Sequence, residues 1–250
     1  MSSITSKAPG VNMTPYYTLN INNYDGKHVE AGWSAVFPGR RQNTVRGSSL
    51  NREENKTRSR RRAKSQIRKK ILAGNFDYLL TLTFKENITD LKRANSYFDK
   101  FIRKVRKHID KNFAYVAVAE KQKRGAYHFH VAVKGWQKVK TLRAIWLRIV
   151  GEGNIDVRAP LKRKSGSQWE KVKLAYYLSK YIAKDDTDEL NKNLYRVSQG
   201  IEIPVEKIIY AFGSYMLQEI EIIMQKYGGY NSNYIEGQFG WVATWSQTDT

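Results

Sequence analysis

The pattern that most constrains the fold is a pair of apolar segments joined by a short polar turn. Phe113 to Glu120 and Tyr127 to Val133 are rich in aromatic, β-branched and small apolar residues, and Lys121 to Gly125 between them is polar. This arrangement predicts a β-hairpin. Side chains alternate between the two faces of a strand, so His128 and His130 are expected to project from the same face.

The segments around this hairpin alternate between strand and helix patterns. Residues 76–84 are apolar and β-branched and predict a buried strand, and residues 89–105 repeat apolar side chains at helical spacing. After the hairpin, the sequence predicts a helix over 142–150, a short strand over 154–157 and a helix over 169–184. The order β-α-β-β-α-β-α predicts an α+β fold of split-βαβ type, with helices covering one face of an antiparallel sheet.

The remaining chain is expected to form three further parts. Residues 1–50 are polar with scattered aromatics and predict an N-terminal arm of loop and short strands, and residues 51–74 predict a basic helix or arm. Residues 75–190 form the expected packed domain. Residues 191–250 are expected to form a C-terminal helical extension and tail, with an apolar helix over about 205–224.

The formal net charge of +21 points to a polyanionic partner, nucleic acid first and an anionic membrane surface second. No apolar run approaches the ~18 residues of a membrane span, so a soluble, cytoplasmic protein is expected. The absence of cysteine excludes disulfides, zinc–thiolate sites and a cysteine nucleophile. A solvated charged helix without function is the alternative for the basic segment. The predicted DNA contacts are Arg58, Arg60, Arg61, Arg62, Lys64, Arg68, Lys69, Lys70, Lys123 and Arg124.

The hairpin also predicts a metal site. Glu120 ends the first strand, and the tight turn brings it back beside His128, with His130 on the same face. Two imidazoles and one carboxylate, with positions left for water and a phosphate oxygen, suit a divalent ion such as Mg²⁺ or Mn²⁺, and imidazole favours Mn²⁺. The alternative is a pair of hydrogen-bonded histidines on a half-buried strand.

The helix over 169–184 carries a second candidate group. One side of it is apolar and consists of Leu174, Ala175, Leu178 and Ile182. A separate stripe combines tyrosine and lysine and consists of Tyr177, Lys180, Tyr181 and Lys184. Lysines beside a tyrosine can lower its pKa and hold a phosphate, which suits nucleophilic attack on phosphorus. A basic face with amphipathic aromatics is the alternative.

Three motifs in this order resemble those of the HUH endonucleases, specifically the rolling-circle replication initiators of phages and plasmids. Tyr78 to Phe84 resembles their first motif, and Glu120 with His128-Phe-His130 resembles their metal motif. Two consecutive Tyr-x-x-Lys sequences, 177–180 and 181–184, resemble their nucleophile motif in its two-tyrosine form.

The resemblance covers residues 76–184 and implies a ferredoxin- or RRM-like core: a sheet of about five antiparallel strands with the tyrosine helix over the metal. It also implies metal-dependent nicking and rejoining of single-stranded or cruciform origin DNA. One tyrosine attacks the scissile phosphodiester, leaving a 5′-phosphotyrosine link and a free 3′-OH that primes rolling-circle replication. Tyr177 is expected to attack first because it lies nearer both lysines on the helical wheel. Tyr181 is expected to be a second nucleophile or a packing residue.

Other activities share parts of this pattern. An HUH-type transposase or relaxase would use the same chemistry, and a non-catalytic DNA-binding regulator would use only the basic surface. The sequence has no Gly-x-x-x-x-Gly-Lys-[Ser/Thr] loop, so a separate host helicase and polymerase are the expected partners of an initiator.

Overall fold

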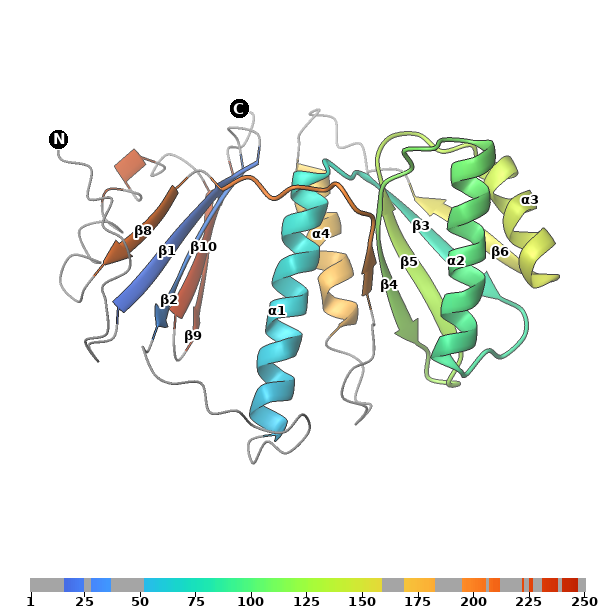
Figure 1. The fold of residues 1–250 in the computed structure, drawn as a ribbon, viewed down its shortest axis with the longest axis horizontal. Helices are drawn as coiled ribbons and strands as arrows, with labels where there is room; N and C mark the ends of the chain where they lie inside the picture. The colour runs from blue at the N-terminus through green and yellow to red at the C-terminus, as the bar shows by residue number, and fades with distance from the viewer. Residues whose placement is uncertain are drawn as a thin grey trace. The chain divides into compact units, whose positions relative to one another are not determined.

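The computed structural model describes residues 16–24, 28–36, 52–158, 169–182, 195–205, 207–211, 222, 225–226, 231–237 and 240–246. The chain divides into two compact units (Figure 1). One unit consists of residues 50–202, and the other combines residues 1–49 with residues 203–250.

The unit of residues 50–202 contains a five-stranded antiparallel sheet with the strand order β6-β3-β5-β4-β7. Its elements are α1 (Arg52–Ala73), β3 (Tyr78–Phe84), α2 (Leu91–His108), β4 (Tyr115–Lys121), β5 (Tyr127–Val133), α3 (Val139–Val150), β6 (Gly153–Arg158), α4 (Trp169–Tyr181) and β7 (Tyr195–Val197). Helix α2 links β3 to β4, and β5 lies between these two strands. The predicted α+β fold of split-βαβ type is therefore confirmed. The short edge strand β7 was not among the predicted strands.

Helices α2 and α3 cover one face of this sheet. Asp90 caps α2 by accepting hydrogen bonds from the backbone N–H groups of Lys92 and Arg93, as expected for a helix beginning there. The apolar stripe of α2 is buried, and Phe98 stacks on Phe129 of β5 with ring centroids 4.7 Å apart. Trp146 of α3 is fully buried in the same core. Burial of these aromatic side chains supplies much of the driving force for this layer.

Helices α1 and α4 pack against each other and contact the opposite face through β4 and β5 (Figure 1). The prediction that helices cover only one face is therefore wrong. The basic composition of α1 concealed a short apolar stripe near its end, where Ile67 and Ile71 lie one turn apart and are fully buried. Ala175 and Leu178 of α4 are also fully buried.

The other unit contains a second five-stranded antiparallel sheet with the order β8-β1-β2-β10-β9. Its strands are β1 (Tyr16–Asn23), β2 (His28–Val36), β8 (Lys207–Ala211), β9 (Asn231–Gly237) and β10 (Gly240–Ser246). The predicted helix over 205–224 is wrong at residues 207–211, which form β8 and pair with β1. The β-branched pair Ile208-Ile209 favours a strand, and the partner strand β1 lies far away in the sequence. Within that predicted helix, residue 222 is helical, and residues 212–221 lie outside the described part of the chain.

No helix among the described residues is both long enough and apolar enough to cross a membrane.

Candidate functional site

The β4–β5 hairpin brings the predicted metal ligands together. Glu120 lies directly opposite His128 in the strand register, and His130 lies opposite Thr81 of β3. Paired residues share a face of an antiparallel sheet, so these four side chains project from the face that α4 covers. Both histidines are buried, with 9% of His128 and 6% of His130 exposed.

The two imidazoles have different hydrogen-bond partners. His130 Nε2 lies 2.7 Å from Glu120 Oε2, and its Nδ1 lies 3.4 Å from Thr81 Oγ1. The amide of Gln122 donates to His128 Nδ1 over 2.9 Å. Among the described residues, His128 Nε2 is buried and has no hydrogen-bond partner. A buried ring nitrogen without a partner has a lone pair available for a proton or a metal.

The pKa of His128 is lowered from its ordinary value. Burial is the largest cause, and the positive charges of Arg124 and His130 add to it, against an opposing effect of Glu120. Desolvation and nearby cations both disfavour the imidazolium form. His128 is therefore held in its neutral form, which is the form that binds metals.

Helix α4 places both predicted tyrosines against this hairpin. The ring of Tyr181 stacks on His130 with centroids 4.1 Å apart, and the ring of Tyr177 meets His130 edge-on at 6.3 Å. The Tyr181 hydroxyl donates a hydrogen bond to the Tyr177 hydroxyl. The two motifs, far apart in the sequence, thus form one cluster.

The two tyrosines differ in exposure. Tyr177 is 39% exposed and Tyr181 only 8%. The pKa of Tyr181 is raised well above its usual range, first by burial and then by its hydrogen bond to Tyr177. Tyr181 therefore retains its proton, and Tyr177 is the hydroxyl that a substrate can reach.

The lysines of the predicted stripe are less fully described. Lys180 is exposed on α4, and Lys184 lies outside the described residues. The apolar residues of the helix are buried as the pattern predicts, and Tyr181 joins them rather than the exposed stripe.

The structure separates the basic residues predicted to contact DNA. Arg61 and Arg62 are exposed, whereas Arg68 is 8% exposed and its guanidinium lies 5.4 Å from the ring centre of Tyr176 on α4. The Lys70 ammonium donates to the backbone carbonyl of Ile201. Arg68 and Lys70 therefore make contacts within the unit.

The other predicted DNA contacts lie on α1 or in the hairpin turn. Arg58 is exposed and pairs with Glu54 at 2.9 Å. Three residues of α1 are half-buried: Arg60, Lys64 and Lys69. Two exposed residues occupy the hairpin turn: Lys123 and Arg124.

Two contacts of the histidines escaped the sequence analysis. Thr81 lies on β3, and only the strand pairing brings it opposite His130. Gln122 lies in the hairpin turn, where it receives a hydrogen bond of 3.1 Å from Arg124 and donates one to His128. The proximity of Gln122 to the histidines in the hairpin was the available signal for it.

The donor types fit a divalent ion, although they do not surround a common point. Within the part of the chain that the structure describes, no group of three or more histidine, aspartate or glutamate side chains has the arrangement of a metal site. Glu120 and His130 are hydrogen-bonded to each other instead. The unpartnered Nε2 of His128 beside this pair is the feature that suits a further ligand atom.

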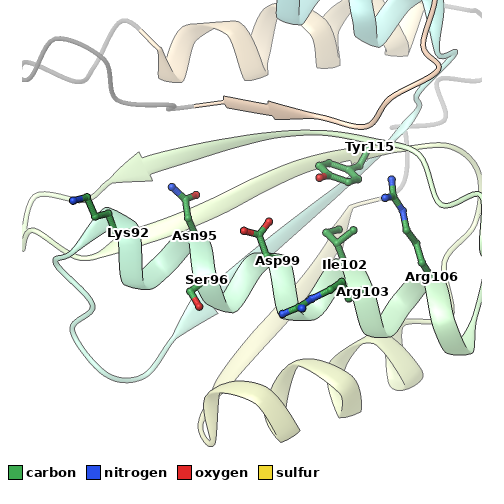
Figure 2. Close-up of a pocket in the computed structure, with 8 residues that line it drawn as sticks. All are labelled: Lys92, Asn95, Ser96, Asp99, Ile102, Arg103, Arg106 and Tyr115. Carbon is green, nitrogen blue, oxygen red and sulfur yellow. The ribbon is translucent and has the colours of Figure 1, made fainter.

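A hollow of about 650 Å³ lies elsewhere, along α2 (Figure 2). Tyr115 lines it and belongs to the core on the α2 face, so the hollow lies on the opposite side of the sheet from the histidines. Its acidic side chain, Asp99, pairs with Arg196 of β7, and Arg106 donates to the carbonyl of Phe113. These charged groups brace the edge of the sheet.

Comparison with known proteins gives one family match. Residues 77–186 match a family model of replication-associated proteins, the ORF2 group. The match runs from the start of β3 past the end of α4 and spans the hairpin and both tyrosines. It is consistent with a replication initiator, and it supports a role in DNA replication and an interaction with DNA.

A solved structure is also similar in part: the crystal structure of the hypothetical protein ORF119 from Sulfolobus islandicus rod-shaped virus 1. It is 16% identical, with a TM-score of 0.34, over 50% of this chain and 97% of that one. No curated protein matches the chain.

Proposed function

We propose that this chain is a replication initiator that nicks single-stranded origin DNA through a tyrosine nucleophile and later rejoins the strand. The observation that carries the proposal is the cluster formed by Tyr177 and Tyr181 on α4 with His130 and Glu120 on the hairpin. The family match over residues 77–186 supports the same role.

In the proposed reaction, Tyr177 supplies the attacking oxygen. A bond forms between its phenolic oxygen and the scissile phosphorus, and the bond from phosphorus to the 3′-oxygen breaks. The phenolic proton is lost, and the departing 3′-oxygen gains a proton. One phosphodiester replaces another, so neither a nucleotide nor an oxidant is consumed. Attack by a 3′-hydroxyl on the phosphotyrosine reverses the reaction and rejoins the strand.

The neighbouring residues have separate roles in this proposal. The exposure of Tyr177 favours it as first nucleophile, and the Tyr181 hydroxyl donates to the attacking oxygen. That hydrogen bond stabilises negative charge on the Tyr177 oxygen as the proton leaves. Lys180 lies one turn beyond Tyr177, where an ammonium group can attract the phosphate.

His128, His130 and Glu120 would hold the divalent ion, Mg²⁺ or Mn²⁺. When bound, such an ion supplies neutralisation of charge on the non-bridging phosphate oxygens. For this, Glu120 and His130 must give up their mutual hydrogen bond. The neutral His128 offers its unpartnered Nε2 without prior loss of a proton.

Formation of a covalent protein–DNA adduct tests the proposal. The full chain is incubated with Mn²⁺ and a pool of random-sequence single-stranded oligonucleotides, and denaturing electrophoresis detects linked DNA. Wild type and Tyr181→Phe should form the adduct, whereas Tyr177→Phe and the double variant should not. Chelation should abolish the adduct and spare most DNA binding. If the double variant forms the adduct as well as wild type, the tyrosine mechanism is wrong. DNA binding with no adduct in any variant would identify a non-catalytic binder.

A further inference from the structure

The turn after β5 exposes a large aromatic side chain. Trp136 is 71% exposed, whereas Trp146 of the following helix is fully buried. Tryptophan carries a large apolar surface, and its exposure forgoes the stabilisation that burial would give. An isolated exposed tryptophan calls for a binding role only where its surroundings support one.

The turn that carries Trp136 is held by side-chain hydrogen bonds. The backbone N–H of Gly135 donates to the Asp77 carboxylate over 2.6 Å. The Gln137 amide donates to the carbonyls of Lys134 and Gly135 over 3.0 and 3.1 Å. Gly135 has a φ of +70°, which glycine adopts without strain. The backbone under the indole is therefore fixed before any ligand arrives, which reduces the entropic cost of binding.

A hollow of about 600 Å³ lies beside Trp136, where the loops after α1, α2, β5 and β7 meet. Phe76, Phe113 and Ile201 contribute apolar wall, and Lys134 and Lys138 contribute ammonium groups. Two acidic residues also line it: Asp110 and Glu202. Asp110 already accepts a hydrogen bond from the backbone N–H of Asn112. The volume lies within the range of small-ligand sites and accommodates a nucleobase.

We propose that Trp136 is a stacking platform for an unpaired base of a DNA strand, with Lys134 and Lys138 on the adjoining phosphates. An exposed indole flanked by lysines matches the combination of aromatic surface and cations by which proteins hold single strands. The net charge of +21 favours a polyanion over a protein partner. The identity of the nucleic acid rests on the proposed function.

The platform lies away from the tyrosine cluster. Val133 at the end of β5 pairs with Tyr78 and Tyr115, whereas His128 near its start pairs with Glu120. Trp136 follows His130 by six positions, so the chain between them spans at most about 20 Å. This corresponds to about six stacked nucleotides. The platform would hold the strand at a distance from the scissile phosphate.

Binding of oligothymidylate to the full chain tests this inference, because thymidine tracts offer bases without pairing. With an oligomer longer than the roughly 4–16 nucleotides of typical single-strand sites, fluorescence anisotropy should show Trp136→Ala binding roughly five- to a hundredfold more weakly. Trp136→Phe should remain within a few-fold of wild type because it retains an aromatic face. Trp136→Leu should be as weak as Trp136→Ala. Val205→Ala removes another exposed apolar side chain and should have no effect.

Salt dependence separates stacking from charge. The ratio between wild type and Trp136→Ala should stay constant from about 50 to 200 mM salt, whereas the double variant Lys134→Gln, Lys138→Gln should flatten the slope. Wild-type affinity of Trp136→Ala or of Trp136→Leu would overturn the inference, the first result pointing to a protein partner for this face. If wild type forms no covalent adduct but Trp136→Ala still binds weakly, the nicking proposal fails and the platform stands.

Discussion

The imidazole of His130 lies flat against the phenol ring of Tyr181, with centroids 4.1 Å apart and planes inclined by 11°. His130 comes from β5 and Tyr181 from α4, so this stack fixes the helix against the hairpin at the level of the candidate site. The Tyr181 hydroxyl then continues to Tyr177. Tyr181 is thus both a packing residue and a hydrogen-bond donor.

These two roles of Tyr181 can be separated by substitution. Tyr181→Phe retains the ring and should lower the free energy of unfolding by only about 1 kcal/mol. Tyr181→Ala also removes the stack and leaves a cavity, and it should cost about 3 kcal/mol or more. Urea denaturation measures both values. Equal losses for the two variants would show that the stack contributes little to stability.

The lowered pKa of His128 predicts a loss of stability in weak acid. Its folded pKa lies below the ordinary value of 6.5, so the unfolded chain takes up a proton that the folded chain resists. The free energy of unfolding should therefore fall as the pH drops through about 6.5. His128→Asn should weaken this dependence between about pH 7.5 and 5.5 in urea titrations. His108→Asn, at an exposed position, is the control and should leave it unchanged. An unaltered slope in His128→Asn would contradict the prediction.

Arg68 and Arg61 should behave differently although both belong to the basic segment. Arg68→Ala removes a buried guanidinium from the ring of Tyr176 and should destabilise the fold by about 1–2 kcal/mol. Arg61→Ala, at an exposed position, should change stability by less than about 0.5 kcal/mol. If Arg61 contacts phosphate, its loss should lower the salt slope of DNA binding by about one unit. Urea denaturation and binding at several salt concentrations measure these effects. The reverse order of stabilities would contradict the assignment of Arg68 as a structural residue.

Binding of Mn²⁺ should stabilise the folded chain. At a free concentration of about 100 times the dissociation constant, the ion should raise the free energy of unfolding by about 2.7 kcal/mol. His128→Ala and Glu120→Ala should lose this gain, and His108→Ala should retain it. Calorimetric titration gives the affinity directly. Equal stabilisation of all variants would place the ion elsewhere.

The central unit was largely predictable because its signals are local. Alternation in Tyr127–Val133, the cap at Asp90 and the stripe of α2 each depend on neighbours within a few residues. Strand β8 and Thr81 depend on pairing between distant segments, which periodicity does not encode. For α1, the lysines and arginines outnumbered a stripe of only a few apolar residues near its end.

The candidate site followed the same division. The facing of Glu120 toward His128 follows from a hairpin with a short turn, and the pattern predicts it. The burial of Tyr181 and the internal contact of Arg68 depend on how α1 and α4 pack together. Helix periodicity alone assigns a residue to a face and leaves open what covers that face.

The register of β5 has an evolutionary consequence. Its histidines face α4 while the residues between them fill the core against α2, so a one-residue insertion within β5 would exchange the two sets. Imidazoles would then enter an aromatic core, and Phe129 would confront the tyrosines. An insertion between Gln122 and Gly125 would only lengthen a surface turn. Homologous chains should therefore vary in length at this turn and preserve the residue count along β5, which a comparison of their sequences can establish.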